Sequence, residues 1–237
     1  MKTLIFIISS ILFFLFIKRW YQPIIKLWPP SRNKKTKIIL GCLPIIFFIV
    51  IILVQTLLIV SDAAFGYFNI LFYIVLGYSY MFLGFLLTSL VFDLHWTEDA
   101  LYLNNKASLF LISGEFFVIA IIYVGAIAGH NNNFRNVLIV CLSGIVAWII
   151  LGLAIHLCTG IFEKINIERD IRCGIRFFFY LLFSGILLGY ACSGNKSFSL
   201  NITDLSISWL VLPLTALYII IELIIIKLER KGKRKND

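Results

Sequence analysis

The sequence is organised as seven long apolar runs separated by short polar segments. A helix rises 1.5 Å per residue and the hydrocarbon core of a membrane is about 30 Å thick, so about 20 apolar residues cross it. Two shorter runs, 3–17 and 177–193, need flanking interfacial residues to complete a span. The pattern predicts an all-α, polytopic membrane protein with transmembrane helices at 3–17, 38–60, 68–92, 108–129, 137–158, 177–193 and 207–226.

The composition supports a lipid environment. Hydrophobic residues make up 61% of the chain, its mean hydropathy is +0.98, and 14% of its residues are charged. Soluble domains are about 45–50% apolar, and a soluble core of this size could not hide the excess from water. The net charge of +9 would otherwise suggest a nucleic-acid partner. Because the basic residues lie in loops and in the tail, we instead expect anionic lipid as the partner and no nucleic acid.

The basic residues are distributed unevenly between the two sides of the predicted helices. Segments 18–37, 93–107 and 159–176 and the tail after residue 226 together carry 18 of the 21 Lys and Arg. Because basic loops remain in the cytosol, this bias predicts that the N-terminus lies outside and the C-terminus inside. The basic tail is predicted to contact the anionic lipids of the inner leaflet, through Lys227, Arg230, Lys231, Lys233, Arg234 and Lys235.

Segment 18–37 combines basic residues with interfacial aromatics and prolines. Trp20 and Trp28 favour the membrane surface. Pro23 and Pro29 oppose a long helix, because proline removes a backbone donor and clashes with the preceding turn. We therefore expect this segment to lie along the inner leaflet, next to an N-terminal anchor helix.

An internal repeat is visible at an offset of about 65 residues. The third and fourth apolar runs, with the loop between them, correspond to the fifth and sixth, and Glu98 corresponds to Glu163. Each unit reads as a helical hairpin that turns in the cytosol, and the two hairpins run in the same direction. We accordingly divide the chain into an anchor helix with a basic loop (1–37), a second span with its outer loop (38–67), a tandem-hairpin unit (68–195), and a last span with a basic tail (196–237).

Glu115 is the charged residue that the topology does not explain. It lies about two turns inside the fourth apolar run. A charged carboxylate at this depth costs several kcal/mol, so it is expected to be protonated, paired or facing a wet cavity. Its role is either to handle a proton or cation, or to bond a neighbouring helix as a packing group. Polar side chains available for a path beside it are Gln55, Tyr78, Ser79, Tyr80, Thr88 and Ser143.

Two further sets of residues predict how the helices pair. Loop 93–107 is the one acidic loop on the predicted cytosolic side, so Glu98 or Asp99 is expected to meet Arg169 or Arg172 of the other hairpin. Small residues allow helices to approach closely within a membrane. Gly125-x-x-x-Gly129 and Gly185-x-x-x-Gly189 therefore predict tight packing in the outer half of the bundle, and a homo-oligomer is one further use of such surfaces.

No set of residues indicates a catalytic or metal site. His156 and Cys158 are two residues apart, but two ligands do not make a metal centre and no further ligand is spaced nearby. The five cysteines contain no CxxC pair and lie mostly in apolar runs, where cysteine acts as a small hydrophobe. Glu222, near the cytosolic end of the last run, is expected to pair with Lys227. We expect no metal, no cofactor and no enzymatic activity.

Two stretches resemble a known family. Residues 104–109, NNKASL, continue into a span through Ser113 and Gly114, and residues 167–174, IERDIRCG, continue to Gly185 and Cys192. These stretches are similar to the two signatures of the YjfL-type bacterial inner-membrane family, although Ile171 and Arg172 stand where small residues are expected. The resemblance covers about residues 68–195 and implies two tandem hairpins in the bacterial cell (inner) membrane, with no established activity.

Three functions remain open at this level. The first is a non-enzymatic membrane component that engages anionic lipid or a membrane partner through its basic segments. The second is a small channel or transporter for ions, protons or solutes, with Glu115 in a polar path between the hairpins. The third, an intramembrane enzyme, has the least support because no nucleophile–base pair can be placed. Polar residues that face Glu115 would favour the channel or transporter. Apolar contacts that seal Glu115 would favour the non-enzymatic membrane component.

Overall fold

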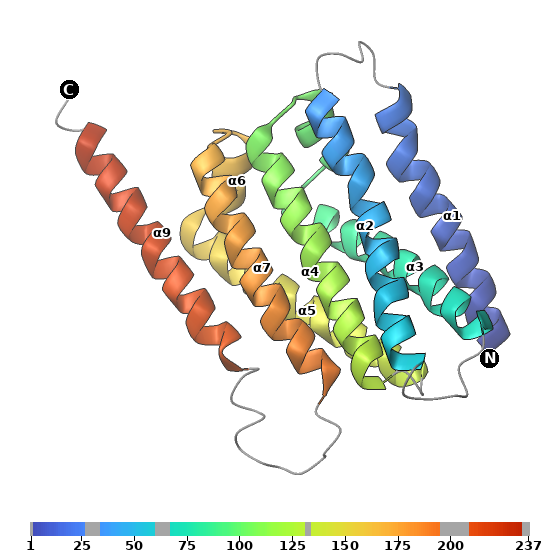
Figure 1. The fold of residues 1–237 in the computed structure, drawn as a ribbon. Coiled ribbons are helices and arrows are strands. Elements are labelled where there is room, and N and C mark those ends of the chain that lie inside the picture. The colour runs from blue at the N-terminus through green and yellow to red at the C-terminus, as the bar shows by residue number, and fades with distance from the viewer. Residues whose placement is uncertain (1, 27–33, 60–66, 131–133, 195–208, 234–237) are drawn as a thin grey trace.

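The computed structural model describes residues 2–26, 34–59, 67–130, 134–194 and 209–233 and is a bundle of helices (Figure 1). Within these residues, seven helices are long and apolar enough to cross a membrane, which confirms the predicted all-α polytopic fold. The seven are α1 (Lys2–Lys26), α2 (Lys34–Ile59), α3 (Tyr67–Phe92), α4 (Lys106–His130), α5 (Phe134–Thr159), α7 (Ile171–Ser193) and α9 (Val211–Lys233). Two short helices, η1 (Thr97–Tyr102) and α6 (Ile161–Asn166), connect α3 to α4 and α5 to α7.

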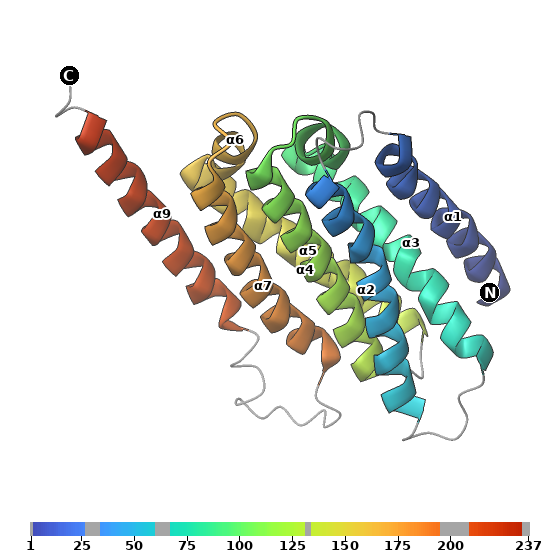
Figure 2. The same cartoon turned by 45° about the horizontal axis from the view of Figure 1, so that its top comes forward.

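Helix α4 lies at the centre of the bundle. It packs along almost the whole of α7 and also contacts α2, α3 and α5. Helix α1 lies against α3 on one flank, and α9 lies against α5 and α7 on the other (Figure 2). The connections η1 and α6 lie at the same end of the bundle. The segments α3–η1–α4 and α5–α6–α7 are therefore two hairpins that run in the same direction, as the repeat predicts.

Helix α1 continues well beyond the first apolar run and includes Pro23. Trp20 is 2% exposed, its indole Nε1 donates to the carbonyl of Leu40 at 2.9 Å, and its ring stacks on Trp96 with 4.4 Å between centroids. These contacts hold the end of α1 in the bundle, where tertiary packing overrides the local preference of proline. The expectation that segment 18–37 lies along the leaflet is wrong for 18–26 and 34–37, which are helical; residues 27–33 lie outside the described part of the chain.

Helix α7 begins at Ile171, six residues before the sixth apolar run. Asp170 caps it, because its carboxylate Oδ1 accepts a hydrogen bond from the backbone N–H of Arg172 at 2.9 Å. The segment from 171 to 176 reads as loop in the sequence because two arginines interrupt its apolar pattern. Arg172 is exposed and Arg176 finds a partner on α9, so both are tolerated within a helix.

The contact between α4 and α7 brings backbone against backbone. A Cβ added at Gly125 would overlap the carbonyl of Gly189, and one added at Gly129 would overlap the carbonyl of Ser193. A Cβ added at Gly185 would lie 3.2 Å from the Cα of Val118. The glycines selected from the sequence therefore lie in one interface, which we call the α4–α7 seam, and they permit its close approach.

The two hairpin turns share a pattern of backbone hydrogen bonds. In the first turn Leu103 N–H donates to Glu98 and Asn105 N–H donates to Asp99; 65 residues later, Glu168 donates to Glu163 and Asp170 to Lys164. The residue before each cap, Asn104 or Arg169, has a positive φ of 52° or 55°. This conformation is uncommon for a residue with a side chain, so its recurrence marks two copies of one turn.

Candidate functional site

Glu115 lies inside the bundle and is 2% exposed. Its neighbours along α4, Ile119 and Ile122, lie against Gly84 of α3 and Gly144 of α5. With 100° per residue, Glu115 falls between the directions of these two side chains and so faces α3 and α5. Among the residues that the structure describes, its Oε1 has no hydrogen-bond partner. The predicted burial is observed, and the carboxyl faces other helices.

The polar side chains predicted to line a path beside Glu115 are mostly engaged with backbone. The hydroxyl of Tyr78 donates to the carbonyl of Pro44, and that of Tyr80 donates to the carbonyl of Cys141. Ser79, Thr88 and Ser143 each bond a carbonyl three residues earlier in their own helix. Gln55 differs, because it is fully buried and both atoms of its amide lack a partner within the described part of the chain. These contacts satisfy hydroxyls and do not assemble a continuous polar path.

An acidic cleft of about 510 Å³ lies where the two hairpin turns meet. Glu98 and Asp99 from the first turn and Glu163 from the second line it, together with His95 and His156. Asp99 is half-buried and its Oδ2 accepts the backbone N–H of His95 at 3.0 Å. Burial raises the pKa of the Asp99 carboxyl, and the nearby charges of Glu98 and Asp93 add to this, while the hydrogen bond and the charge of His95 oppose it.

The two turns are joined by amides instead of the predicted ion pairs. Across the described residues, neither Glu98 nor Asp99 forms an ion pair with Arg169 or Arg172, whose side chains are exposed. The buried Asn105 Nδ2 instead donates to the carbonyl of Ile165 at 2.8 Å. A short neutral amide satisfies a buried carbonyl without desolvating a charge, which explains this difference from the sequence prediction.

A second asparagine contact accompanies it. The Ser108 hydroxyl donates to Asn166 Oδ1 at 3.2 Å, again from the first hairpin to the second. Sequence reasoning selected charges here and missed the amides. Asn105 entered the sequence analysis only as part of the stretch 104–109 that carries the family resemblance, and Asn166 lies one residue before the second stretch, 167–174.

Glu222 forms a close ion pair with Arg176 of α7. Nε of Arg176 donates to Oε1 at 2.6 Å and Nη2 donates to Oε2 at 3.1 Å, while the Glu222 side chain is 1% exposed. The expected partner Lys227 is replaced because Arg176 reaches across from the neighbouring helix in a two-pronged geometry. Thr215 of α9 is also bonded to α7, through the hydroxyl of Tyr180 at 2.9 Å.

The remaining predicted residues are placed without gathering into a site. His156 packs on Phe162, and Cys158 is exposed at the end of α5. Groups of three or more His, Cys, Asp or Glu side chains that could hold a metal are absent from the described residues. In the basic tail, Lys227 is exposed on α9, the side chains of Arg230, Lys231 and Lys233 are not described, and Arg234 and Lys235 lie outside the described residues.

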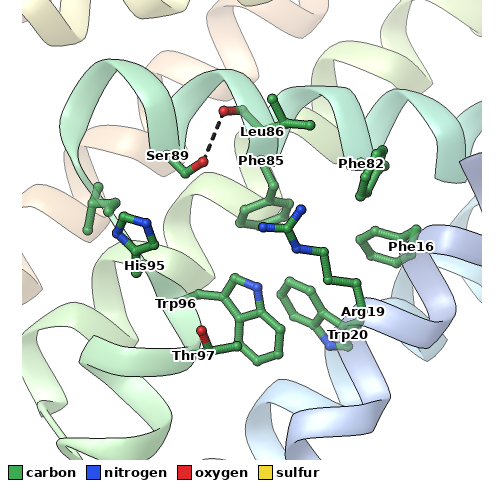
Figure 3. A pocket seen from close by; sticks show the side chains of 11 residues that line it. Phe16, Arg19, Trp20, Phe82, Phe85, Leu86, Ser89, His95, Trp96 and Thr97 are labelled. Carbon is green, nitrogen blue, oxygen red and sulfur yellow. Dashed lines mark hydrogen bonds between the residues drawn. The ribbon is translucent and has the colours of Figure 1, made fainter.

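A pocket of about 70 Å³, which we call the arginine–aromatic pocket, lies between α1, α3 and the start of η1 (Figure 3). Arg19 reaches across it, with the stacked indoles of Trp20 and Trp96 on one side and Phe85 on the other. The remaining polar side chains of its lining are Ser89, His95 and Thr97. Sequence reasoning missed this pocket because its α1 wall is more than 60 residues away in the chain from its other walls.

Comparison with known proteins adds no relative. No family model, curated protein or solved structure matches this chain, so the resemblance to the YjfL-type family stays a prediction.

Proposed function

We propose that the chain is a non-enzymatic, multi-pass component of a cell membrane. Its N-terminus lies outside and its C-terminus inside, and its basic end engages anionic lipid. The observation that carries the proposal is the closed centre of the bundle. The α4–α7 seam joins backbone to backbone, and the tyrosine hydroxyls predicted to line a path beside Glu115 are bonded to carbonyls. A closed centre favours a structural or recruiting role over passage of a solute.

The position of the basic segments supports the proposed orientation. The C-terminal end of α1, the N-terminal end of α2, both hairpin turns and the C-terminal end of α9 lie at one end of the bundle (Figure 1). These elements carry exposed cations such as Lys18, Lys34 and Lys227. Because cytosolic loops hold an excess of Lys and Arg, this end is proposed to face the cytosol.

The proposed setting is the bacterial inner membrane. It rests on the resemblance of residues 104–109 and 167–174 to the YjfL-type signatures. The recurrent bonds of the two turns support this proposal, because a tandem hairpin is the architecture that the resemblance implies.

The alternative function is a small channel or transporter for protons, ions or solutes. One observation favours it: the Oε1 atom of the buried Glu115 has no partner among the described residues. Such a group in a membrane span is a functional candidate by default, because its burial without a partner is costly.

Flux measurements decide between the two functions. The purified protein is reconstituted into liposomes that hold a pH-sensitive dye, and proton and potassium fluxes are measured after an imposed gradient. We expect the flux to equal that of protein-free liposomes and Glu115→Gln to leave it unchanged. A flux above that background which Glu115→Gln abolishes, and which Thr56→Ala on the exposed surface of α2 preserves, would establish the transporter instead.

A further inference from the structure

We infer that the arginine–aromatic pocket binds the phosphate group of an anionic phospholipid. The inference rests on the proposed function and deepens it, because it names one site at which the basic end holds its lipid. The pocket lies at the end of α1 and α3 where they meet η1. This end carries the basic segments that are proposed to face the inner leaflet, where anionic headgroups are found.

The polar lining of the pocket suits an anion. Arg19 is its permanent cation, and no carboxylate is among the described residues that line it. Arg19 forms no ion pair with any residue that the structure describes. The guanidinium carries five donors in a planar fork that matches a phosphate group. The site therefore offers a fixed positive charge that no described acidic residue neutralises.

Further donors are among the side chains that line the pocket. The indole nitrogen of Trp96 lies on the ring edge that faces Arg19 (Figure 3). The hydroxyl of Thr97 and the imidazole of His95 also line the pocket. By contrast, the indole Nε1 of Trp20 already donates to Leu40, which anchors the floor of the pocket to α2. A phosphate oxygen can thus bond both a cation and neutral donors.

The apolar part of the lining favours a lipid over free phosphate. Five of the eleven residues that line the pocket are Phe or Trp, including Phe16, Phe82 and Phe85. The outer face of α1 next to it exposes Phe14 and Leu15. Free phosphate gains nothing from such surfaces, whereas the glycerol and upper acyl carbons of a phospholipid bury apolar area against them. Tryptophan pairs also favour the headgroup level of a membrane.

Brominated lipids test the inference directly, because bromine quenches tryptophan fluorescence only at contact. The full-length protein is reconstituted in mixtures of phosphatidylcholine and phosphatidylglycerol in which one lipid is dibrominated. Trp20 and Trp96 lie beside the pocket and report on it. We expect brominated phosphatidylglycerol to quench more than brominated phosphatidylcholine at equal fractions, and Trp96→Phe to remove most of this excess.

Arg19→Gln is the decisive variant. It should lower the relative affinity for phosphatidylglycerol about fivefold, the effect of about 1 kcal/mol for one basic residue near anionic lipid. Lys18→Gln is the matched control, since Lys18 is exposed, carries the same charge and does not line the pocket. Equal effects of both substitutions would overturn the inference in favour of general attraction to the surface. Thr97→Val, which keeps the cation and removes one donor, should give a smaller loss if Arg19→Gln does not fold.

Two further measurements are needed. One distinguishes a lipid headgroup from free phosphate as the ligand, and the other distinguishes failure of the pocket from failure of the proposed function. Inorganic phosphate at millimolar concentration should not restore the fluorescence quenched by brominated phosphatidylglycerol; restoration would assign the pocket to a free anion and overturn the lipid. The flux assay is independent of this result. Conduction that depends on Glu115 would refute the proposed function while leaving the lipid preference intact, and loss of the preference without conduction would refute only the pocket.

Discussion

At the scale of single residues, buried carboxyl groups differ in whether they have a partner. Glu222 holds a two-pronged pair with Arg176, whereas the Oε1 of Glu115 has no partner among the described residues. Asp99 is intermediate, because it is half-buried and accepts one backbone hydrogen bond. Sequence reasoning selected Glu115 correctly as a buried group from its depth in an apolar run. It could not find the partner of Glu222, which is 46 residues away in the chain.

The raised pKa of Asp99 predicts how its replacement changes the pH dependence of stability. A carboxyl whose pKa is higher in the folded than in the unfolded protein contributes stability that is complete below the unfolded pKa and lost as the pH rises through the folded value. Asp99→Asn cannot lose this contribution, and its amide oxygen can still accept from His95. The unfolding midpoint of Asp99→Asn relative to the native protein should therefore be higher at pH 7 than at pH 4.

Thermal unfolding in detergent micelles at the two pH values measures this difference. Glu98→Gln is the control, because Glu98 lines the same cleft but its side chain is exposed. The unfolding midpoint of Glu98→Gln relative to the native protein should change less between pH 4 and pH 7. An Asp99→Asn midpoint that falls relative to the native protein as the pH rises would contradict the assignment.

At the scale of helices, each span could be predicted where its own residues carry the signal. All seven apolar runs became membrane-length helices, because every backbone group in lipid must be bonded within its own helix. The ends of α1 and α7 could not be predicted, since Pro23 and the arginines of α7 obey local rules that distant contacts override. Trp20 is held by Leu40 and Trp96, and neither contact is readable from the local pattern.

The Arg176–Glu222 pair is one of the contacts that join α9 to α7. Glu222→Leu leaves the Arg176 guanidinium without its partner, and Arg176→Leu leaves the buried carboxyl without its own. Each single change is expected to destabilise the fold by about 3 kcal/mol, the usual effect of breaking a buried pair. The double variant should lose less free energy of unfolding than either single variant, since both buried charges are then removed. Chemical unfolding in micelles supplies the three free energies, and a double variant as unstable as the sum of the singles would contradict the coupling.

At the scale of the whole molecule, the two hairpins are held together along the α4–α7 seam and at their turns. The glycines of the seam could be selected from sequence because small residues four apart are typical of close helix pairs. The sequence could not predict which helices these glycines join, since the pairing of α4 with α7 is a property of the assembled bundle. The arginine–aromatic pocket was missed for the same reason, as α1 and η1 meet only in the folded chain.

The seam predicts opposite effects for two alanine substitutions. Gly125→Ala places a methyl group on the carbonyl of Gly189 and forces the helices apart, so it should lower the free energy of unfolding by about 2 kcal/mol. Gly41→Ala in α2 meets nothing within 4 Å and should raise it by about 1 kcal/mol through helix propensity. Thermal unfolding of both variants in one detergent provides the comparison, and a Gly125→Ala protein as stable as Gly41→Ala would exclude a tight seam.

The recurrence of one turn geometry 65 residues along the chain has a consequence for the seam. When two copies of a unit are related by a two-fold axis, equivalent elements meet their own counterparts at the axis. Helices α4 and α7 are such counterparts, they run in parallel, and Gly125 meets Gly189, which lies 64 residues later. The seam thus places equivalent helices of the two copies side by side within a single polypeptide, while their surroundings differ, because α4 also packs against α3 and α5. Because both copies lie in one chain, equivalent positions carry different residues: α4 is capped by the Asn105 amide and α7 by the Asp170 carboxylate.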